Sequence, residues 1–487
     1  MLFPVRPPDD EGLEGSALSA RTALRTAYRM DETACVRERA ARGRLSAAER
    51  GATQQLARDL VTAVRARRSH GIEAFLREYG LDTREGIVLL CVAETLLRIP
   101  DAATADRLIR DKIGGAEWDR HLGQSRSLFV NASTWGLMLT GRVVRFEPDD
   151  GAMRRLVGHA GEPVVRAALL QAMKILGHQF VLGRTIVEAM TNAVPNEKRG
   201  VRFSYDMLGE GARTADDASR YWQRYADAIA AIGARATGAA VADRPGISVK
   251  MSALHPRYEF AKRRRLHNEL MPRLVDLAQL AARHNIGLCI DAEEADRLEP
   301  SLDMIERLAR DPALSGWDGL GLAVQAYQKR GLPLIDWLAD LARNSRRRLM
   351  VRLVKGAYWD TEVKRAQESG VEGYPVFTRK VSTDVSYLAC TRAMFAAGNR
   401  LYPQFATHNA YTVAALLAMG GSGTAFEFQR LHGMGEALYE ELRARSKAPV
   451  RVYAPVGAHE DLLPYLVRRL LENGANTSFV NRIHDET

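Results

Sequence analysis

The hydrophobic pattern of this chain changes near residue 195. Between residues 16 and 150 the apolar positions follow a helical period, and GIVLLCVAETLLRI (86–99) is apolar almost all round, so Ile87 to Ile99 should lie buried. A second stretch with a period of about 3.6 residues covers 151–195. We therefore predict a helical arm and α-region over 16–150 and a helical α-domain or linker over 151–195. A tail rich in Pro, Gly and acidic residues precedes them over 1–15.

Beyond Pro195, short β-rich runs alternate with amphipathic helices. Three of these helices are expected at Arg264–Arg283, Leu332–Arg343 and Gly435–Lys447. Runs that are nearly continuous in Val, Ile and Leu suit a sheet that is buried on both faces. The eight expected strands are 201–206, 247–251, 287–291, 321–324, 350–355, 404–407, 425–429 and 451–454.

Eight β/α units in succession are typical of a closed parallel barrel. We therefore assign 196–487 to the α/β class, as a (β/α)8 TIM-type barrel preceded by the all-helical arm and α-domain. An open doubly wound sheet is the alternative, but no glycine-rich dinucleotide fingerprint follows any of the expected strands.

Composition adds few constraints. The chain of 487 residues is 46% hydrophobic and 26% charged, which is ordinary for a soluble globular protein. Its longest apolar run, Ile87 to Ala93, is far shorter than the roughly 20 residues that a membrane-spanning helix needs. The N-terminus carries no signal-peptide pattern, so we expect a cytoplasmic protein. The cysteines lie far apart in sequence and are expected to be small buried side chains: Cys35, Cys91, Cys289 and Cys390.

The net charge of +10 is compatible with a nucleic-acid, anionic-lipid or acidic-metabolite partner. The basic clusters, such as Lys262 to Arg265 and Arg346 to Arg348, border expected helices or strands and lack interleaved aromatic residues. We interpret them as solvated helix ends and expect no nucleic-acid partner.

A parallel barrel has its active site at the carboxyl ends of its strands. In this chain those ends are consistently polar, which packing alone does not explain, so we predict a functional site there. We expect Asp206 and His255 instead to point between helices as surface groups. The polar positions at the other strand ends are Lys250, Asp291, Gln325, Arg352, Lys355, Tyr358, Trp359, Thr407, His408, Gln429, His432 and Tyr453.

The last expected helix, 465–475, carries a second signal. Arg468 and Arg469 are adjacent and could bind one carboxylate together, as an amino-acid substrate requires. Arg468 and Glu472 are four residues apart, so an ordinary surface ion pair explains this stretch equally well.

Metal ligation is the obvious rival role for the histidines. His255, His408, His432 and His459 are scattered without ligand spacing, although Asp291 and nearby glutamates could join them in a two-metal hydrolase site. We predict no metal site.

Several long blocks resemble the proline dehydrogenase domain of bacterial proline utilisation A, and the region 16–195 looks like that family's arm and α-domain. The blocks are GISVKMSALHPRYE (246–259), VRLVKGAYWD (351–360), QFATHN (404–409), FEFQRLHGMG (426–435), VYAPVG (452–457) and YLVRRLLENGANTSFVNR (465–482).

The resemblance implies a non-covalent FAD and the oxidation of L-proline to Δ1-pyrroline-5-carboxylate. It makes Asp291 and Arg352 catalytic, with Arg352 donating to the flavin N5 region. The implied cofactor-binding residues are Ala292, Gln325, Arg352, Val354, Lys355, Gly356, Trp359, Thr378, Thr407 and His408. The implied proline-binding residues are Lys250, Asp291, Tyr358, Leu431, Tyr453, Arg468, Arg469 and Glu472.

The resemblance also suggests a quinone as electron acceptor and peripheral contact with the inner membrane; it leaves the oligomeric state open. We expect neither the aldehyde dehydrogenase half nor the ribbon-helix-helix DNA-binding domain of that family in this chain. Two other classes stay open: a lyase or aldolase with Lys250 or Lys355 as a Schiff base, and a non-catalytic carboxylate-binding or nucleic-acid-associated module.

Overall fold

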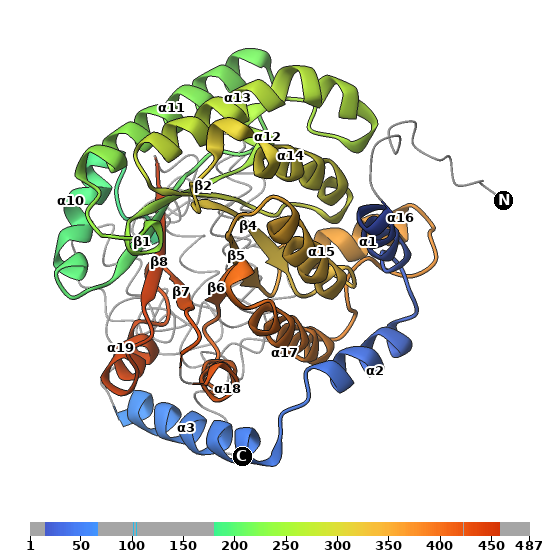
Figure 1. The fold of residues 1–487 in the computed structure, drawn as a ribbon, viewed down its shortest axis with the longest axis vertical. Helices are drawn as coiled ribbons and strands as arrows, with labels where there is room; N and C mark the ends of the chain where they lie inside the picture. The colour runs from blue at the N-terminus through green and yellow to red at the C-terminus, as the bar shows by residue number, and fades with distance from the viewer. Residues whose placement is uncertain (1–14, 67–100, 102–103, 105–179, 422, 458–487) are drawn as a thin grey trace.

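A closed barrel of eight parallel strands forms the centre of the protein (Figure 1). The computed structural model describes residues 15–66, 101, 104, 180–421 and 423–457. Each strand pairs with its sequence neighbours, and β8 closes the ring on β1, which confirms the predicted (β/α)8 class. The strands are β1 Arg202–Met207, β2 Gly246–Val249, β3 Gly287–Ile290, β4 Leu320–Gln325, β5 Leu349–Val354, β6 Leu401–Ala406, β7 Glu427–Leu431 and β8 Val450–Val456.

Strand boundaries differ from the expected ones mainly at β2, β6 and β7. β7 covers Glu427–Leu431, two residues later at each end than the expected 425–429. β6 begins at Leu401, three residues before the expected start, although Pro403 interrupts the strand pattern. Pro403 is in register with Val351 of β5, so the ladder continues past a residue that cannot donate a hydrogen bond. β2 ends at Val249, because a short helix begins at Met251.

The helices that follow the strands surround the barrel, and their amphipathic patterns explain their position (Figure 1). Thr214 and Asp217 form a reciprocal capping box that fixes the start of α11. The expected helices at 264–283, 332–343 and 435–447 correspond to α13, α15 and α19. The described helices outside the arm are α10 Ile186–Glu197, α11 Ala215–Arg235, α12 Met251–Leu254, α13 Arg263–Arg283, α14 Leu298–Arg310, α15 Gly331–Asn344, α16 Trp359–Glu368, α17 Lys380–Ala396, α18 Ala410–Gly420 and α19 Glu436–Arg445.

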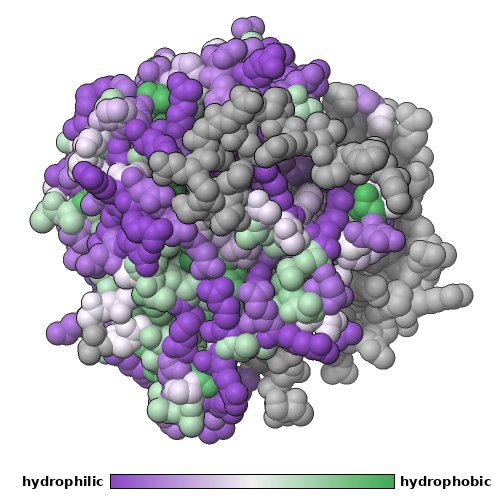
Figure 2. Space-filling view, turned by 45° about the vertical axis from the view of Figure 1, so that its right-hand side comes forward, coloured by the Kyte–Doolittle hydropathy of each residue, from purple (hydrophilic) through white to green (hydrophobic). Residues whose placement is uncertain are grey.

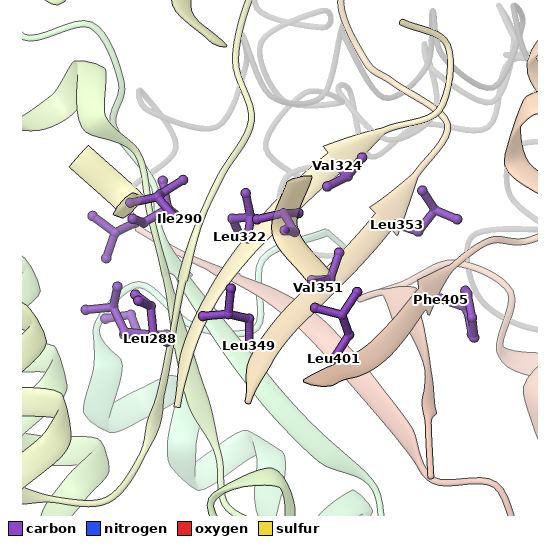
Figure 3. Close-up of a cluster of buried hydrophobic side chains, with 14 of the residues drawn as sticks. Leu288, Ile290, Leu322, Val324, Leu349, Val351, Leu353, Leu401 and Phe405 are labelled. Atoms are coloured by element: carbon purple, nitrogen blue, oxygen red, sulfur yellow. The ribbon is translucent and has the colours of Figure 1, made fainter. Parts of the chain in front are cut away.

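The main hydrophobic core lies between the strands and this layer of helices (Figure 3). Leu288 and Ile290 of β3 belong to it, as do Val351 and Leu353 of β5. Successive strand residues point to opposite faces, so the intervening positions point into the barrel. Because Val351 and Leu353 face the helices, the Arg352 side chain between them points into the barrel.

The amino-terminal end of the barrel interior is filled by a polar network around Glu427, which is fully buried. Its carboxylate accepts hydrogen bonds from Arg451 Nε at 2.6 Å, Gln404 Nε2 at 2.8 Å and Gln429 Nε2 at 3.0 Å. Burial raises the pKa of Glu427, but Arg451 and the hydrogen bonds lower it overall. This network closes the end of the barrel opposite the predicted site.

The N-terminal arm runs around the outside of the helical layer as α1 Gly15–Thr26, α2 Glu32–Arg42 and α3 Ala47–Ala66 (Figure 1). It packs along α15, α17, α18 and α19. Ion pairs fasten it: Arg21 Nη2 lies 3.2 Å from Glu306 Oε2, and Arg392 Nη1 lies 2.8 Å from Glu49 Oε1. Hydrophilic side chains dominate the described part of the face in Figure 2, as expected when apolar positions turn inward.

The structure bears on the remaining predictions about helices, domains and cysteines to different extents. The predicted buried helix at Ile87 to Ile99 lies outside the described residues, and the domain divisions at 15, 150 and 195 stay predictions. Cys35, Cys289 and Cys390 are buried as expected. Among the described helices, none combines the length and apolarity needed to cross a membrane.

Candidate active site

Four of the predicted residues converge at the carboxyl end of the barrel. Lys250 Nζ lies 3.1 Å from Asp291 Oδ2, which also accepts a hydrogen bond from the Tyr453 hydroxyl at 2.7 Å. The other oxygen of Asp291 accepts a hydrogen bond from Arg352 Nη2. Asp291 is therefore the centre of a cluster drawn from β5, β8 and the residues that directly follow β2 and β3, which we call the Asp291 cluster.

Asp206 belongs to this cluster, so its expected position between helices is wrong. Its side chain is fully buried, and its Oδ1 lies 2.7 Å from Lys250 Nζ. The reason is the pairing of β1 with β2, which puts Asp206 in register with Ser248, two residues before Lys250.

Ser248 is a contributor that the sequence interpretation missed. Its hydroxyl accepts a hydrogen bond from Arg352 Nη1 at 3.0 Å. Strand alternation could have identified it, because Ser248 and Lys250 are two residues apart and share the inward face. The guanidinium of Arg352 also lies over the Tyr453 ring, 4.9 Å from its centroid, so three groups fix its position.

Electrostatics keep Lys250 and Asp291 ionised at neutral pH. Burial lowers the pKa of Lys250, but Asp206, Tyr453 and Asp291 outweigh it and hold that pKa well above its ordinary value. Burial raises the pKa of Asp291, whereas Lys250 and Arg352 lower it overall. Burial and the two carboxylates raise the pKa of Tyr453, so it stays a hydrogen-bond donor.

The charges of the Asp291 cluster balance. Two cations, Lys250 and Arg352, face two carboxylates, Asp206 and Asp291. A substrate carboxylate therefore finds no surplus positive charge there and needs cations from elsewhere.

Gln325, at the end of β4, has both ends of its amide engaged. Its Oε1 accepts a hydrogen bond from Gln328 Nε2 at 2.6 Å, and its Nε2 donates to the Glu293 carbonyl at 3.2 Å. Gln328 was not predicted, and Glu293 was considered only as a possible metal ligand; nothing in their sequence spacing indicates these contacts with Gln325.

The loop after β5 holds several predicted cofactor residues. Lys355 is buried, and its Nζ lies 2.5 Å from Asp384 Oδ1 of α17. Gly356 has a φ of +138°, and a Cβ there would lie 2.4 Å from Cδ1 of Tyr327. Trp359 donates from Nε1 to the Phe377 carbonyl at 2.8 Å. Only glycine fits at 356, because the backbone approaches an aromatic ring too closely for a side chain.

The remaining predicted residues lie around the same strand ends. His408 Nε2 accepts the backbone N–H of Leu431 at 3.1 Å, which joins the loops after β6 and β7. The Thr407 carbonyl accepts from Tyr439 at 2.7 Å. Ala292, Val354 and Tyr358 are half-buried, whereas Thr378 is exposed and hydrogen-bonded to Glu32 of the arm.

The other two described histidines at the strand ends, His432 and His255, lie outside the Asp291 cluster. Burial and Arg430 lower the pKa of His432 to about 4, so it is neutral at physiological pH. His255 is buried rather than at the surface as expected. Its ring nitrogens have partners there: Glu269 Oε2 lies 3.1 Å from Nε2, and the backbone N–H of Arg257 donates to Nδ1 at 3.0 Å. Within the described ranges, no three metal-binding side chains gather into a group that could hold an ion.

The predicted proline-binding residues Arg468, Arg469 and Glu472 lie outside the described residues. Their place relative to the Asp291 cluster stays a prediction.

Three family models match the chain. A model described as proline dehydrogenase matches residues 189–482, and the N-terminal domain of proline utilization A proline dehydrogenase matches 19–65. A model described as the DNA-binding domain of proline dehydrogenase matches 71–180, almost all outside the described residues. The last match leaves the expected absence of a nucleic-acid partner unsupported.

Related proteins agree with these models. The chain is 52% identical over 484 residues to the bifunctional protein PutA of Salmonella typhimurium, covering 96% of this chain and 37% of that protein. It is 51% identical over 492 residues to PutA of Rhizobium meliloti, covering 99% of this chain and 39% of that protein. The chain thus spans well under half the length of these relatives.

A solved structure of Bradyrhizobium japonicum proline utilization A, the mutant D778Y, is similar in fold and sequence. The match has a TM-score of 0.72 and 50% identity, and covers 94% of this chain and 47% of that one. The proline dehydrogenase model covers the whole barrel with its polar mouth, and more than half of the sequence. The chain therefore belongs to the proline dehydrogenase family.

Proposed function

We propose that this chain is an FAD-dependent proline dehydrogenase that oxidises L-proline to Δ1-pyrroline-5-carboxylate, the first step of proline breakdown. The observation that carries the proposal is the Asp291 cluster at the carboxyl mouth of a barrel that matches the proline dehydrogenase family.

The donor set at the mouth fits a flavin. Arg352 is a buried cation held by Asp291 and Ser248, and a fixed cation suits a ring that becomes electron-rich on reduction. Lys355, His408 and the close-lying backbone at Gly356 supply further polar groups along one side of the mouth. We assign the cofactor to these residues together with Gln325, Trp359, Thr378, Thr407, Ala292 and Val354.

When bound, the flavin supplies the acceptor at N5 for a hydride from proline C5. The task of this chain is to position the substrate and adjust its protonation. Tyr453 donates to Asp291 and presents a ring beside Arg352, so it forms a wall on which a pyrrolidine ring can pack. Leu431 and Tyr358 complete the wall in this proposal.

Recognition of the proline carboxylate falls to Arg468 and Arg469, with Glu472 nearby, because the Asp291 cluster has no surplus positive charge. These arginines also disfavour a second cation beside them. They therefore lower the pKa of the proline ammonium group and favour the neutral amine, whose lone pair assists loss of the hydride.

The Schiff-base alternative is disfavoured on physical grounds. A Schiff base requires a neutral lysine amine, but Lys250 is held charged between Asp206 and Asp291. Lys355 likewise pairs with Asp384.

The decisive experiment is anaerobic mixing of the purified protein with L-proline while the visible flavin absorbance is followed. We expect a yellow protein whose flavin band bleaches with proline. A colourless protein that FAD does not reconstitute, or a flavin that proline does not reduce, contradicts the proposal.

We propose a quinone as the electron acceptor, reached by peripheral contact with a membrane. Proline-dependent reduction of a short-chain quinone, measured with and without anionic lipid vesicles, tests both parts. Absence of quinone reduction by a protein whose flavin proline does bleach would exclude the acceptor while leaving the dehydrogenase intact.

DNA binding is a second candidate function, favoured only by the family model over 71–180. Binding to duplex DNA that weakens steeply with salt would support it. Equal mobility of labelled DNA with and without the protein at low salt would remove it.

A further inference from the structure

The turn that joins α1 to the first residue of α2, residues 28–32, lies against the loop that follows β4. We call this turn the arm corner. The guanidinium of Arg330 lies over the Tyr28 ring, 4.2 Å from its centroid, and Lys329 Nζ donates to the Met30 carbonyl at 2.9 Å. The arm thus contacts the loop that directly follows Gln325, the last residue of β4.

A continuous chain of contacts leads from the arm corner to Gln325. Arg330 Nη2 donates to Gln328 Oε1 at 3.1 Å and to the Ala295 carbonyl. Gln328 in turn donates from Nε2 to Gln325 Oε1 at 2.6 Å. Because Gln328 accepts at one amide atom and donates at the other, its orientation determines which end of the Gln325 amide faces it.

Tyr28 covers the face of the Arg330 guanidinium, whose Nη2 is hydrogen-bonded to Gln328 and Ala295. The Arg330 side chain is buried, and its Nε has no hydrogen-bond partner among the described residues. Burial lowers the pKa of Arg330, which reflects the cost of keeping a guanidinium in this place. A ring face at van der Waals distance is a partner that compensates a buried cation without a carboxylate.

We propose that Tyr28 and Arg330 are a positioning pair for the cofactor site, acting through Gln328 on the side-chain amide of Gln325. The inference rests on the proposed function, in which Gln325 contacts the flavin. It assigns a role in this site to the arm, although none of the proposed cofactor residues belongs to the arm.

A second contact of the arm corner also links it to proposed cofactor residues. The Glu32 carboxylate accepts hydrogen bonds from both the backbone N–H and the hydroxyl of Thr378 at 3.1 Å. The preceding residue, Phe377, accepts from Trp359. One turn of the arm therefore reaches the surroundings of three proposed cofactor residues.

The test compares Tyr28→Leu with Tyr28→Phe, which keeps the ring face. FAD affinity is titrated on the apoprotein, and the flavin absorbance spectrum is recorded. We expect Tyr28→Leu to weaken FAD binding about tenfold and to shift the visible flavin band, while Tyr28→Phe matches the wild type. Arg42→Met, which removes an exposed arm contact to Asp336, is the matched control and should leave both readouts unchanged.

Gln328→Met cuts the chain of contacts without touching the arm, so it tests the route even if Tyr28→Leu does not fold. We expect the same loss of FAD affinity, and no further loss when Tyr28→Leu is added, because the link is already broken. Wild-type affinity and spectrum in Tyr28→Leu, or in Gln328→Met, would overturn the inference. So would losses that add in full in the double variant.

The wild-type protein separates the two proposals. If it binds FAD and proline bleaches the flavin, the proposed function stands. The Tyr28 and Gln328 variants then test the positioning pair. If the wild-type protein binds no FAD, both proposals fall together.

Discussion

The ammonium group of Lys250 lies 2.7 Å from the carboxylate of Asp206 at the mouth of the barrel. Asp206 is fully buried, and its second oxygen has no hydrogen-bond partner among the described residues. Lys250 is thus the partner on which this buried carboxylate depends, and in turn Asp206 keeps Lys250 charged beside the proposed substrate.

Asp206→Asn should therefore destabilise the protein by about 3 kcal/mol, because it removes one member of a buried ion pair. Chemical denaturation measures the change in unfolding free energy. Asp243→Asn removes a half-exposed partner of Arg202 and is the control, with an expected cost below about 1 kcal/mol. Equal costs for the two variants would contradict the importance of the Lys250 pair.

Arg352→Met should slow reduction of the flavin by proline about a hundredfold and change the flavin spectrum, since one fixed cation is lost from the site. Stopped-flow absorbance under anaerobic conditions measures both. Arg348→Met, just before the same strand, is the control. A wild-type reductive half-reaction in Arg352→Met would refute its assigned role.

Arg469→Met should raise the KM for proline tenfold or more, about the value of a hydrogen bond between charged groups, without lowering flavin content. Steady-state kinetics and the flavin-to-protein absorbance ratio test this. Arg445→Met alters a cation on α19 that pairs with Glu441, and it should leave KM unchanged. An unchanged KM in Arg469→Met removes that residue from the pocket.

Gly356→Ala should destabilise the protein by about 3 kcal/mol and weaken FAD binding, because its Cβ would meet the Tyr327 ring in a backbone conformation that disfavours side chains. Gly316→Ala is the matched control: Gly316 has a φ of +77° but open space around its Cβ position. It should cost only about 1 kcal/mol. Thermal unfolding measures the stability of both variants. The difference between them gives the cost of the clash with Tyr327, because both variants carry the cost of a side chain at positive φ.

The ion pair between Glu49 of the arm and Arg392 should make arm docking sensitive to acid. Hydrogen bonds from Arg392 lower the pKa of Glu49 from 4.5 to about 2. The stability gained from this depressed pKa is fully present above pH 4.5 and is lost as the pH falls towards 2.

The difference in unfolding free energy between wild type and Glu49→Gln should therefore shrink over that range. Denaturation curves at several pH values measure it, with Glu368→Gln as the control for loss of an exposed carboxylate. A difference that stays constant from neutral pH down to about pH 3 would contradict this assignment.

The sequence by itself determined the order and number of the strands, because each is a short apolar run set between turn residues and an amphipathic helix. It also indicated the polar mouth, since carboxyl ends of parallel strands meet at one rim. Pro403 shows the limit of such local signals. Proline argues against a strand, yet β6 stays in register with β5 through Pro403, and its pairing with β7 begins at the next residue, Gln404.

Only the tertiary structure decided which polar groups meet. Closure of β8 on β1 and the register of neighbouring strands bring Tyr453 and Asp206 to Lys250, residues separated by up to 203 positions. The contact of Tyr28 with Arg330 likewise depends on how the arm winds around the helices. Hydrophobic periodicity specifies the face that a residue occupies, but the partner it meets there is fixed by the packing of the whole barrel.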